Sequence, residues 1–196
     1  MSSFLSSLRN YLRITRADSI ARRYLAMNGF DGALTTLGVI MGAYIAGALE
    51  IKLILSAGFG ASLAMGISGA TGAYMAEKAE RVKSMKELED AMFTTLNDTV
   101  IEKASNAAVY FVAFVDALSP IVASLISLSP FIASSFGLLN VTDALYLSLG
   151  LNGATLFVLG VFLGKTSRSN VLFYGGLMVL AGFVTAMVMV LISIFF

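Results

Sequence analysis

The stretch that decides the fold is MNGFDGALTTLGVIMGAYIAGALE, residues 27–50, in which almost every side chain is small or apolar. Its only charged residue before the final Glu50 is Asp31. A run of about 20 mainly apolar residues is long enough to cross a bilayer as a helix. A carboxylate inside such a helix is costly unless it faces a partner, a cavity or an ion. The stretch predicts a transmembrane helix with a functional acid; the competing interpretation is an interfacial Asp31 paired with Arg22 or Arg23.

The composition of the whole chain also indicates an integral membrane protein. Of the 196 residues, 58% are hydrophobic and only 13% are charged, about half the charged fraction of a soluble domain. The chain has no cysteine and no histidine, so disulfides and thiolate or imidazole metal sites are excluded. No phosphate loop, dinucleotide fingerprint or catalytic serine–histidine pair is present. We therefore expect neither an enzyme, nor a permanently bound cofactor, nor a nucleic-acid partner.

Five apolar stretches are long enough to span a membrane: residues 25–49, 53–76, 107–131, 144–164 and 171–195. The sequence thus predicts an all-α integral membrane protein with five transmembrane helices. A charged helical insert, cytoplasmic by the charge argument below, separates helices two and three. We divide the chain into a basic amphipathic N-terminal segment (1–24), transmembrane helices one and two (25–76), the insert (77–104) and transmembrane helices three to five (105–196).

The basic residues give the orientation. With five spans, 12 of the 13 Lys and Arg residues fall on one side of the membrane, and only Lys52 lies opposite. Basic residues are enriched in cytoplasmic loops. We therefore expect a multi-pass protein with its N-terminus in the cytoplasm and its C-terminus outside. The compact loops favour a prokaryotic plasma membrane.

Asp116 is a second acid in an apolar stretch, about ten residues into the third predicted span. Pro120 follows four residues later, and a proline frees the carbonyl of the residue four positions before it. A carboxylate beside a free carbonyl suits a proton-carrying or metal-binding site, and we take Asp116 as the candidate for proton coupling. The competing interpretation is a protonated Asp116 bonded to a neighbouring helix.

The segment RRYLAMNGFDGALTTLGVIMGA, residues 22–43, resembles the first span of the vacuolar iron transporter family. The matching residues are Arg23, Asp31, Gly32, Thr35, Gly38 and Gly42, whereas Asn28 replaces a glycine of the family pattern. The five-span layout with a charged insert is similar too. The resemblance implies that Asp31 binds a metal ion within the membrane and that the protein is a homodimer. It identifies the chain as a divergent, prokaryotic member.

The second span departs from that family. The stretch SGATGAY, residues 68–74, has Gly69 where the family has methionine and Ala73 where it has glutamate. Both positions that would supply ligands are therefore lost. Met65 and Glu77 lie one helical turn from them on the same face. They would supply a thioether and a carboxylate if the ion sits displaced along the helix axis.

The insert carries further acids. Glu77, Glu80 and Glu87 fall near one helix face, and carboxylates at such spacing suit divalent ions that prefer oxygen. In the resembling family the insert binds iron, but it is longer and richer in glutamate. The alternative is a solvated helix face with ion pairs such as Glu87 with Lys83 or Lys86.

Together these features predict a divalent metal transporter that moves Fe²⁺, with Mn²⁺ as the alternative ion, out of the cytoplasm. Proton exchange is the candidate coupling, because a metal ion must displace protons from carboxylates. The metal ligands would come from Asp31, Met65, Glu77, Glu80 and Glu87. Two other hypotheses stay open: a membrane scaffold that has lost its metal site and transports nothing, and a carrier for a small organic solute.

Overall fold

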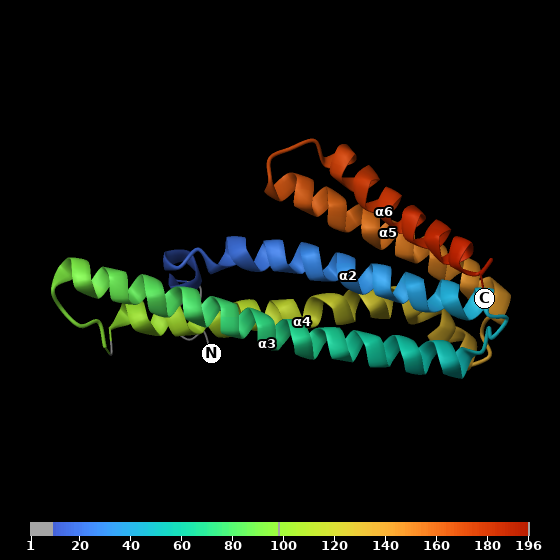
Figure 1. Ribbon diagram of the computed structural model, residues 1–196, viewed down its shortest axis with the longest axis horizontal. Helices are drawn as coiled ribbons and strands as arrows, with labels where there is room; N and C mark the ends of the chain where they lie inside the picture. The colour runs from blue at the N-terminus through green and yellow to red at the C-terminus, as the bar shows by residue number, and fades with distance from the viewer. Residues whose placement is uncertain (1–9, 98, 196) are drawn as a thin grey trace.

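The computed structural model describes residues 10–97 and 99–195, and within them it holds five long helices and no strand. The helices are α2 (Ala17–Ile45), α3 (Ile51–Met92), α4 (Val100–Ser135), α5 (Val141–Thr166) and α6 (Val171–Ile192). Figure 1 shows α2, α3 and α4 running side by side, with the α5–α6 hairpin on the side of α2 away from α3. The hairpin contacts α2 and α4. The all-helical prediction is confirmed.

Helix ends follow local chemistry. Gly47 and Gly137 take left-handed φ angles of 67° and 77° after α2 and α4. In these turns the amides of Ala48 and Leu138 donate back to the helix carbonyls of Ala43 and Ala133, as in glycine-terminated helices generally. Such turns reverse the chain within a few residues, which makes neighbouring helices antiparallel.

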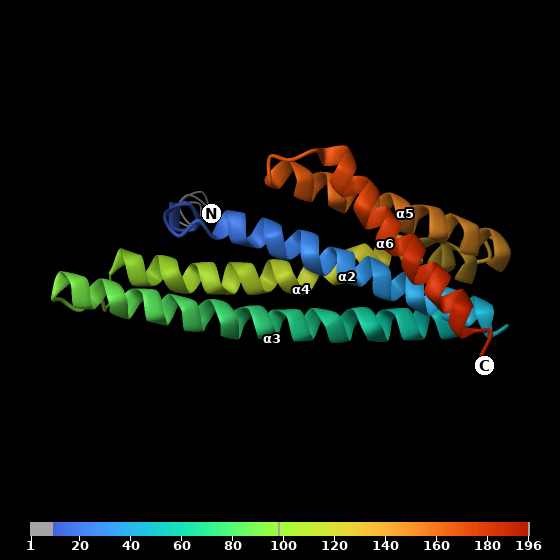
Figure 2. The same ribbon diagram turned by 45° about the horizontal axis from the view of Figure 1, so that its top comes forward.

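The charged insert is not a separate helix. α3 continues from the predicted second span through residue 76 to Met92, and α4 begins at Val100 and runs unbroken into the third. With 42 residues, α3 is about 63 Å long at 1.5 Å per residue, about twice the thickness of a bilayer core. α3 and α4 therefore form a hairpin that projects beyond the apolar part of the molecule (Figures 1 and 2).

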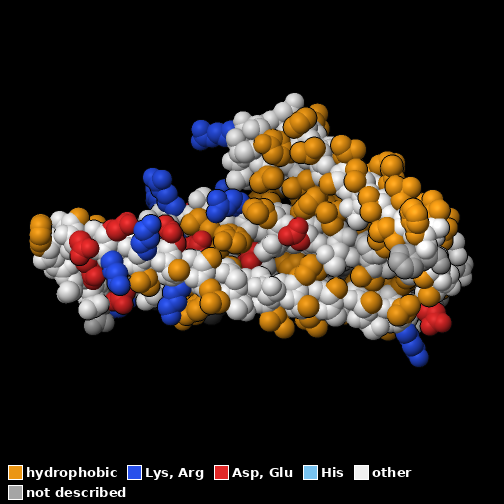
Figure 3. Space-filling model, in the orientation of Figure 1, with side chains coloured by type: hydrophobic (Ala, Val, Ile, Leu, Met, Phe, Trp, Pro, Cys, Tyr) orange, Lys and Arg blue, Asp and Glu red, His pale blue; other side chains and the backbone are white. Residues whose placement is uncertain are grey.

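Side-chain chemistry is divided along the long axis. Figure 3 shows Lys, Arg, Asp and Glu gathered over the end that holds the α3–α4 hairpin, while hydrophobic side chains cover most of the other end. By length and apolar composition, α3, α4, α5 and α6 are able to cross a membrane. A membrane-embedded helical protein is the fold that this division supports.

Two features of α2 differ from the predicted first span. α2 begins at Ala17, so residues 17–24 belong to this helix and not to a separate N-terminal segment, whose residues 1–9 lie outside the described part. α2 is also absent from the helices apolar enough to cross a membrane, because Asn28, Asp31, Thr35 and Thr36 lower its hydropathy. The count of five spans is therefore not confirmed.

α2 is nevertheless the central helix, since it contacts α3, α4, α5 and α6. Small residues allow these contacts: a Cβ added to Gly32 would lie 2.6 Å from the Cα of Pro120 on α4. Small residues let membrane helices approach closely. The close approach of α2 and α4 fixes where Asp31, next to Gly32, lies.

Three apolar clusters pack the helices together. One cluster near the start of α2 includes Ala21, Ala73 and Val112; one in the middle includes Ala33, Ala123 and Leu156; one near the end of α2 includes Ile40 and Phe131. Interhelical hydrogen bonds add to this packing. They run from the hydroxyls of Ser119 and Ser124 to α2 carbonyls, and from the amide of Asn152 to the Ala33 carbonyl.

Candidate functional site

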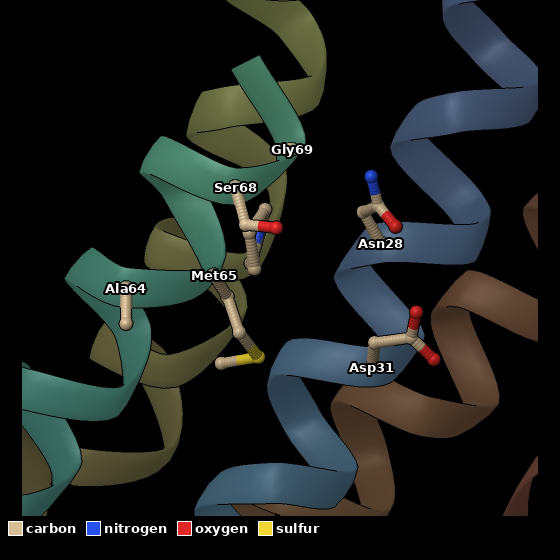
Figure 4. A pocket seen from close by; sticks show the side chains of 7 residues that line it. Asn28, Asp31, Ala64, Met65, Ser68 and Gly69 are labelled. Atoms are coloured by element: carbon tan, nitrogen blue, oxygen red, sulfur yellow. The ribbon is translucent and has the colours of Figure 1, made fainter. Parts of the chain in front are cut away.

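A cavity of about 420 Å³ opens between α2, α3 and α4, and Asp31 lines it. Its other lining residues are Asn28, Ala64, Met65, Ser68, Gly69 and Pro120. Figure 4 shows Asn28 and Asp31 on successive turns of α2, with Ala64, Met65, Ser68 and Gly69 on α3 across from them. The structure thus brings together two predicted metal ligands, Asp31 and Met65, that are 34 positions apart in the chain.

Asp31 is not used in an ion pair with the nearby arginines. Within the described residues, Arg22 pairs with Asp18 at 3.4 Å, and Arg23 lies over the ring of Tyr24. The Asp31 side chain is solvent-exposed in the single chain. The interfacial salt bridge to Arg22 or Arg23 is therefore not what holds this carboxylate.

Asp116 lies behind the cavity wall formed by Gly69. A Cβ added to Gly69 would be 3.0 Å from Asp116 Oδ2. The other carboxylate oxygen, Oδ1, accepts a hydrogen bond from the side-chain amide of Asn28. Asp116 is 2% exposed. Asp31 lines the cavity, and Asp116 adjoins two of the other lining residues, Asn28 and Gly69.

The glutamates of the insert lie elsewhere. Glu77 is buried and forms an ion pair with Arg81 at 3.4 Å, and Glu80 lines a second cavity of about 400 Å³ together with Arg23. Glu87 is an exposed residue that lies 4.0 Å from Lys83. None of the three lines the Asp31 cavity.

Acidic side chains in the described part of the insert do not gather in groups of three. Across residues 10–97 and 99–195, no three acidic side chains lie together in a way that would hold a metal ion. For Glu87, the alternative of a solvated face paired with Lys83 is confirmed. For Glu77, the arginine one turn away explains the buried carboxylate.

Ala73 is 3% exposed and packs in the apolar cluster with Ala21 and Val112. A carboxylate at this position would lie among apolar side chains of α2, α3 and α4. Ala73 is therefore a packing residue, and the α3 residues of the cavity begin one turn before it, at Gly69.

Sequence reasoning missed two polar residues of the α2–α4–α5 interior. Asn28 was seen only as a departure from a glycine, yet it binds Asp116. Asn152 on α5 is 1% exposed and donates to both Ala33 O and Ser127 Oγ at 2.9 Å. The available signal was a polar amide inside an apolar stretch, which marks a buried contact in membrane helices.

The glycines of the helices differ in the packing around them. Cβ atoms added to Gly160 and Gly164 would meet the backbone of α6 at Gly175 and Val171, at 2.7 and 2.8 Å, whereas Gly38 and Gly72 have open space around them. The Gly160–Gly164 stripe therefore packs α5 against α6 within one chain.

The chain is similar in sequence to the uncharacterized protein MJ0645 of Methanocaldococcus jannaschii. The two are 31% identical over 190 residues, which cover 95% of each chain. No family model and no solved structure matches the chain.

Proposed function

Because the chain belongs to the same family as this archaeal protein, whose name assigns no activity, we propose its function from the site alone: a membrane transporter for a divalent metal ion. The observation that carries the proposal is the cavity that holds Asp31 together with Met65 and Ser68. An ionisable residue inside a membrane segment marks a substrate or ion pathway more often than a structural contact. A carboxylate, a hydroxyl and a thioether together form a donor set for Fe²⁺ or Mn²⁺.

We place the cavity inside the membrane by counting α2 as a fifth span. The helix has 29 residues, about 44 Å at 1.5 Å per residue, which exceeds the 30 Å of a bilayer core. Its contacts with all four apolar helices support the same assignment. In the resulting orientation the α3–α4 hairpin is cytoplasmic and the C-terminus is outside, and the archaeal relative supports a prokaryotic plasma membrane.

The exposure of Asp31 also supports a homodimer. Asp31 and Ser68 are exposed in the single chain, and a carboxylate facing hydrocarbon at this depth would cost about 2.5–3.5 kcal/mol on insertion scales. A second copy that covers this face would enclose the cavity and remove that cost. The homodimer that the resemblance to vacuolar iron transporters implies would therefore enclose the Asp31 cavity between two copies of the chain.

Metal flux into proteoliposomes tests the proposal. We expect the wild type to carry Fe²⁺ or Mn²⁺, and Asp31→Asn to lose this flux. Asp18→Asn is the matched control, because Asp18 is an exposed acid on the same helix, away from the cavity. Equal flux through wild type and Asp31→Asn would remove Asp31 from the mechanism. No binding of either ion to the wild type would favour the scaffold or organic-solute hypotheses.

A further inference from the structure

Resting on the proposed function, we propose that Asp116 is a second metal ligand of the Asp31 cavity and makes the site selective for ions that prefer oxygen donors. Asp116 is on α4, 85 positions after Asp31. Its carboxylate lies beside the cavity wall, and its two oxygens have different surroundings.

Asn28 sets the orientation of the Asp116 carboxylate. Asn28 lines the cavity and donates its side-chain amide to Asp116 Oδ1. This bond occupies one oxygen and fixes the rotation of the carboxylate about its last bond. Outer partners of this kind orient metal ligands. Asn28 is therefore a positioning residue.

The other carboxylate oxygen of Asp116, Oδ2, is not held by Asn28. Within the described ranges, the hydrogen bond to Asp116 is the one that Oδ1 accepts from Asn28. Oδ2 is not among the fully buried side-chain atoms without a partner, so this oxygen keeps some accessible surface although the residue is 2% exposed. A carboxylate oxygen that has little access to water and no protein donor is unfavourable. A cation bound in the cavity would satisfy it.

Gly69 lies between Asp116 Oδ2 and the cavity. Oδ2 lies 3.0 Å from the position that a Cβ on residue 69 would occupy, and residue 69 is a glycine that lines the cavity. Any larger residue would stand between Oδ2 and the cavity. Gly69 thus leaves the opening through which Asp116 reaches an ion.

The resulting donors are two carboxylates, from Asp31 and Asp116, with the Ser68 hydroxyl and the thioether of Met65. Oxygen ligands outnumber sulfur, which favours Mn²⁺ or Fe²⁺ over a thiophilic ion such as Cd²⁺. Loss of Asp116 should therefore weaken Mn²⁺ binding more than Cd²⁺ binding, because the thioether remains.

The test is calorimetric titration of the purified full-length protein in nanodiscs with Mn²⁺ and with Cd²⁺. We expect Asp116→Asn, which keeps the acceptor for Asn28, to weaken Mn²⁺ binding about tenfold or more and to lower the ratio of Mn²⁺ to Cd²⁺ affinity. Gly69→Ala should act in the same direction with Asp116 intact. Gly72→Ala is the control, since a Cβ there would meet nothing within 4 Å.

Each other outcome has a defined meaning. If Asp116→Asn and Gly69→Ala bind Mn²⁺ as the wild type does, while Asp31→Asn does not, Asp116 is no ligand and the proposed transport function still stands. An equal loss of affinity for both ions in Asp116→Asn would assign Asp116 a structural role and overturn the selectivity. If the wild type binds neither ion, both proposals are wrong.

Discussion

Replacing Gly32 with alanine tests the contact between α2 and α4 that places Asp31. A Cβ on residue 32 would lie 2.6 Å from both the Cα and the carbonyl oxygen of Pro120, about 1 Å inside the 3.5–4.0 Å optimum for carbon contacts. Both obstructing atoms belong to the backbone, so no rotamer change relieves the overlap. The two helices must separate, which also lengthens the 3.2 Å bond from the Ser124 hydroxyl to the Gly32 carbonyl.

Overpacking of this kind costs about 1–3 kcal/mol. The matched control is Gly38→Ala on the same helix, where a Cβ would meet no atom within 4 Å. Both variants gain the same helix propensity, up to about 1 kcal/mol, so the difference between them isolates the steric cost. We expect Gly32→Ala to unfold more easily than Gly38→Ala by about 1–3 kcal/mol.

Equilibrium unfolding in mixed micelles, followed by circular dichroism, measures this difference. Gly32→Ala should also weaken metal binding, because Asp31 is the preceding residue. Equal unfolding free energies for Gly32→Ala and Gly38→Ala would show that α2 and α4 do not meet at this glycine, and the geometry of the cavity would then be wrong.

Two further predictions concern topology and the insert. Because the chain has no cysteine, single cysteines report topology cleanly. Ser19 and Ala46 are exposed residues at the two ends of α2. With five spans, Ser19→Cys should react with an impermeant maleimide only from the cytoplasmic side and Ala46→Cys only from outside, and labelling of both from one side would refute the fifth span. Glu77→Gln leaves the half-buried Arg81 unpaired, so it should lower the unfolding free energy by up to about 3 kcal/mol. Glu87→Gln removes an exposed ion pair, so it should change the unfolding free energy by under about 1 kcal/mol. A similar small effect of both substitutions on unfolding would contradict the structural role of the Glu77 pair.

The helical membrane class could be predicted from the sequence because apolar length is a property of each segment alone. The ends of the helices could not be predicted in this way. The predicted second span ended at residue 76, where apolar composition ends, but α3 continues to Met92. The segment between contains no glycine or proline, so nothing in the backbone stops the helix. Hydropathy reports where a helix leaves the membrane and not where it terminates.

The site was predictable only in part, for a similar reason. Asp31 and Asp116 stood out as acids in apolar stretches, and helical spacing pointed to Met65. The bond from Asn28 to Asp116 joins residues 88 positions apart, and no local pattern encodes such a contact. For Glu77 a local signal did exist, since an arginine four residues later is a common helical partner. That spacing indicates an ion pair for Glu77 before it indicates a metal ligand.

Asn28 on α2 and Gly69 on α3 both adjoin the Asp116 carboxylate on α4. The sequence analysis treated these three residues separately, because they come from three helices and no local spacing links them.

The unbroken course of α3 couples two distant parts of the molecule. One rigid rod carries the cavity residues Met65 and Gly69 near its middle and ends at Met92, about 35 Å beyond Gly69 at 1.5 Å per residue. A tilt of about 5° pivoting at Gly69 would swing the far end by about 3 Å over that length. A spin label or fluorophore on the hairpin tip would therefore report small rearrangements of the ion cavity as larger displacements of the tip.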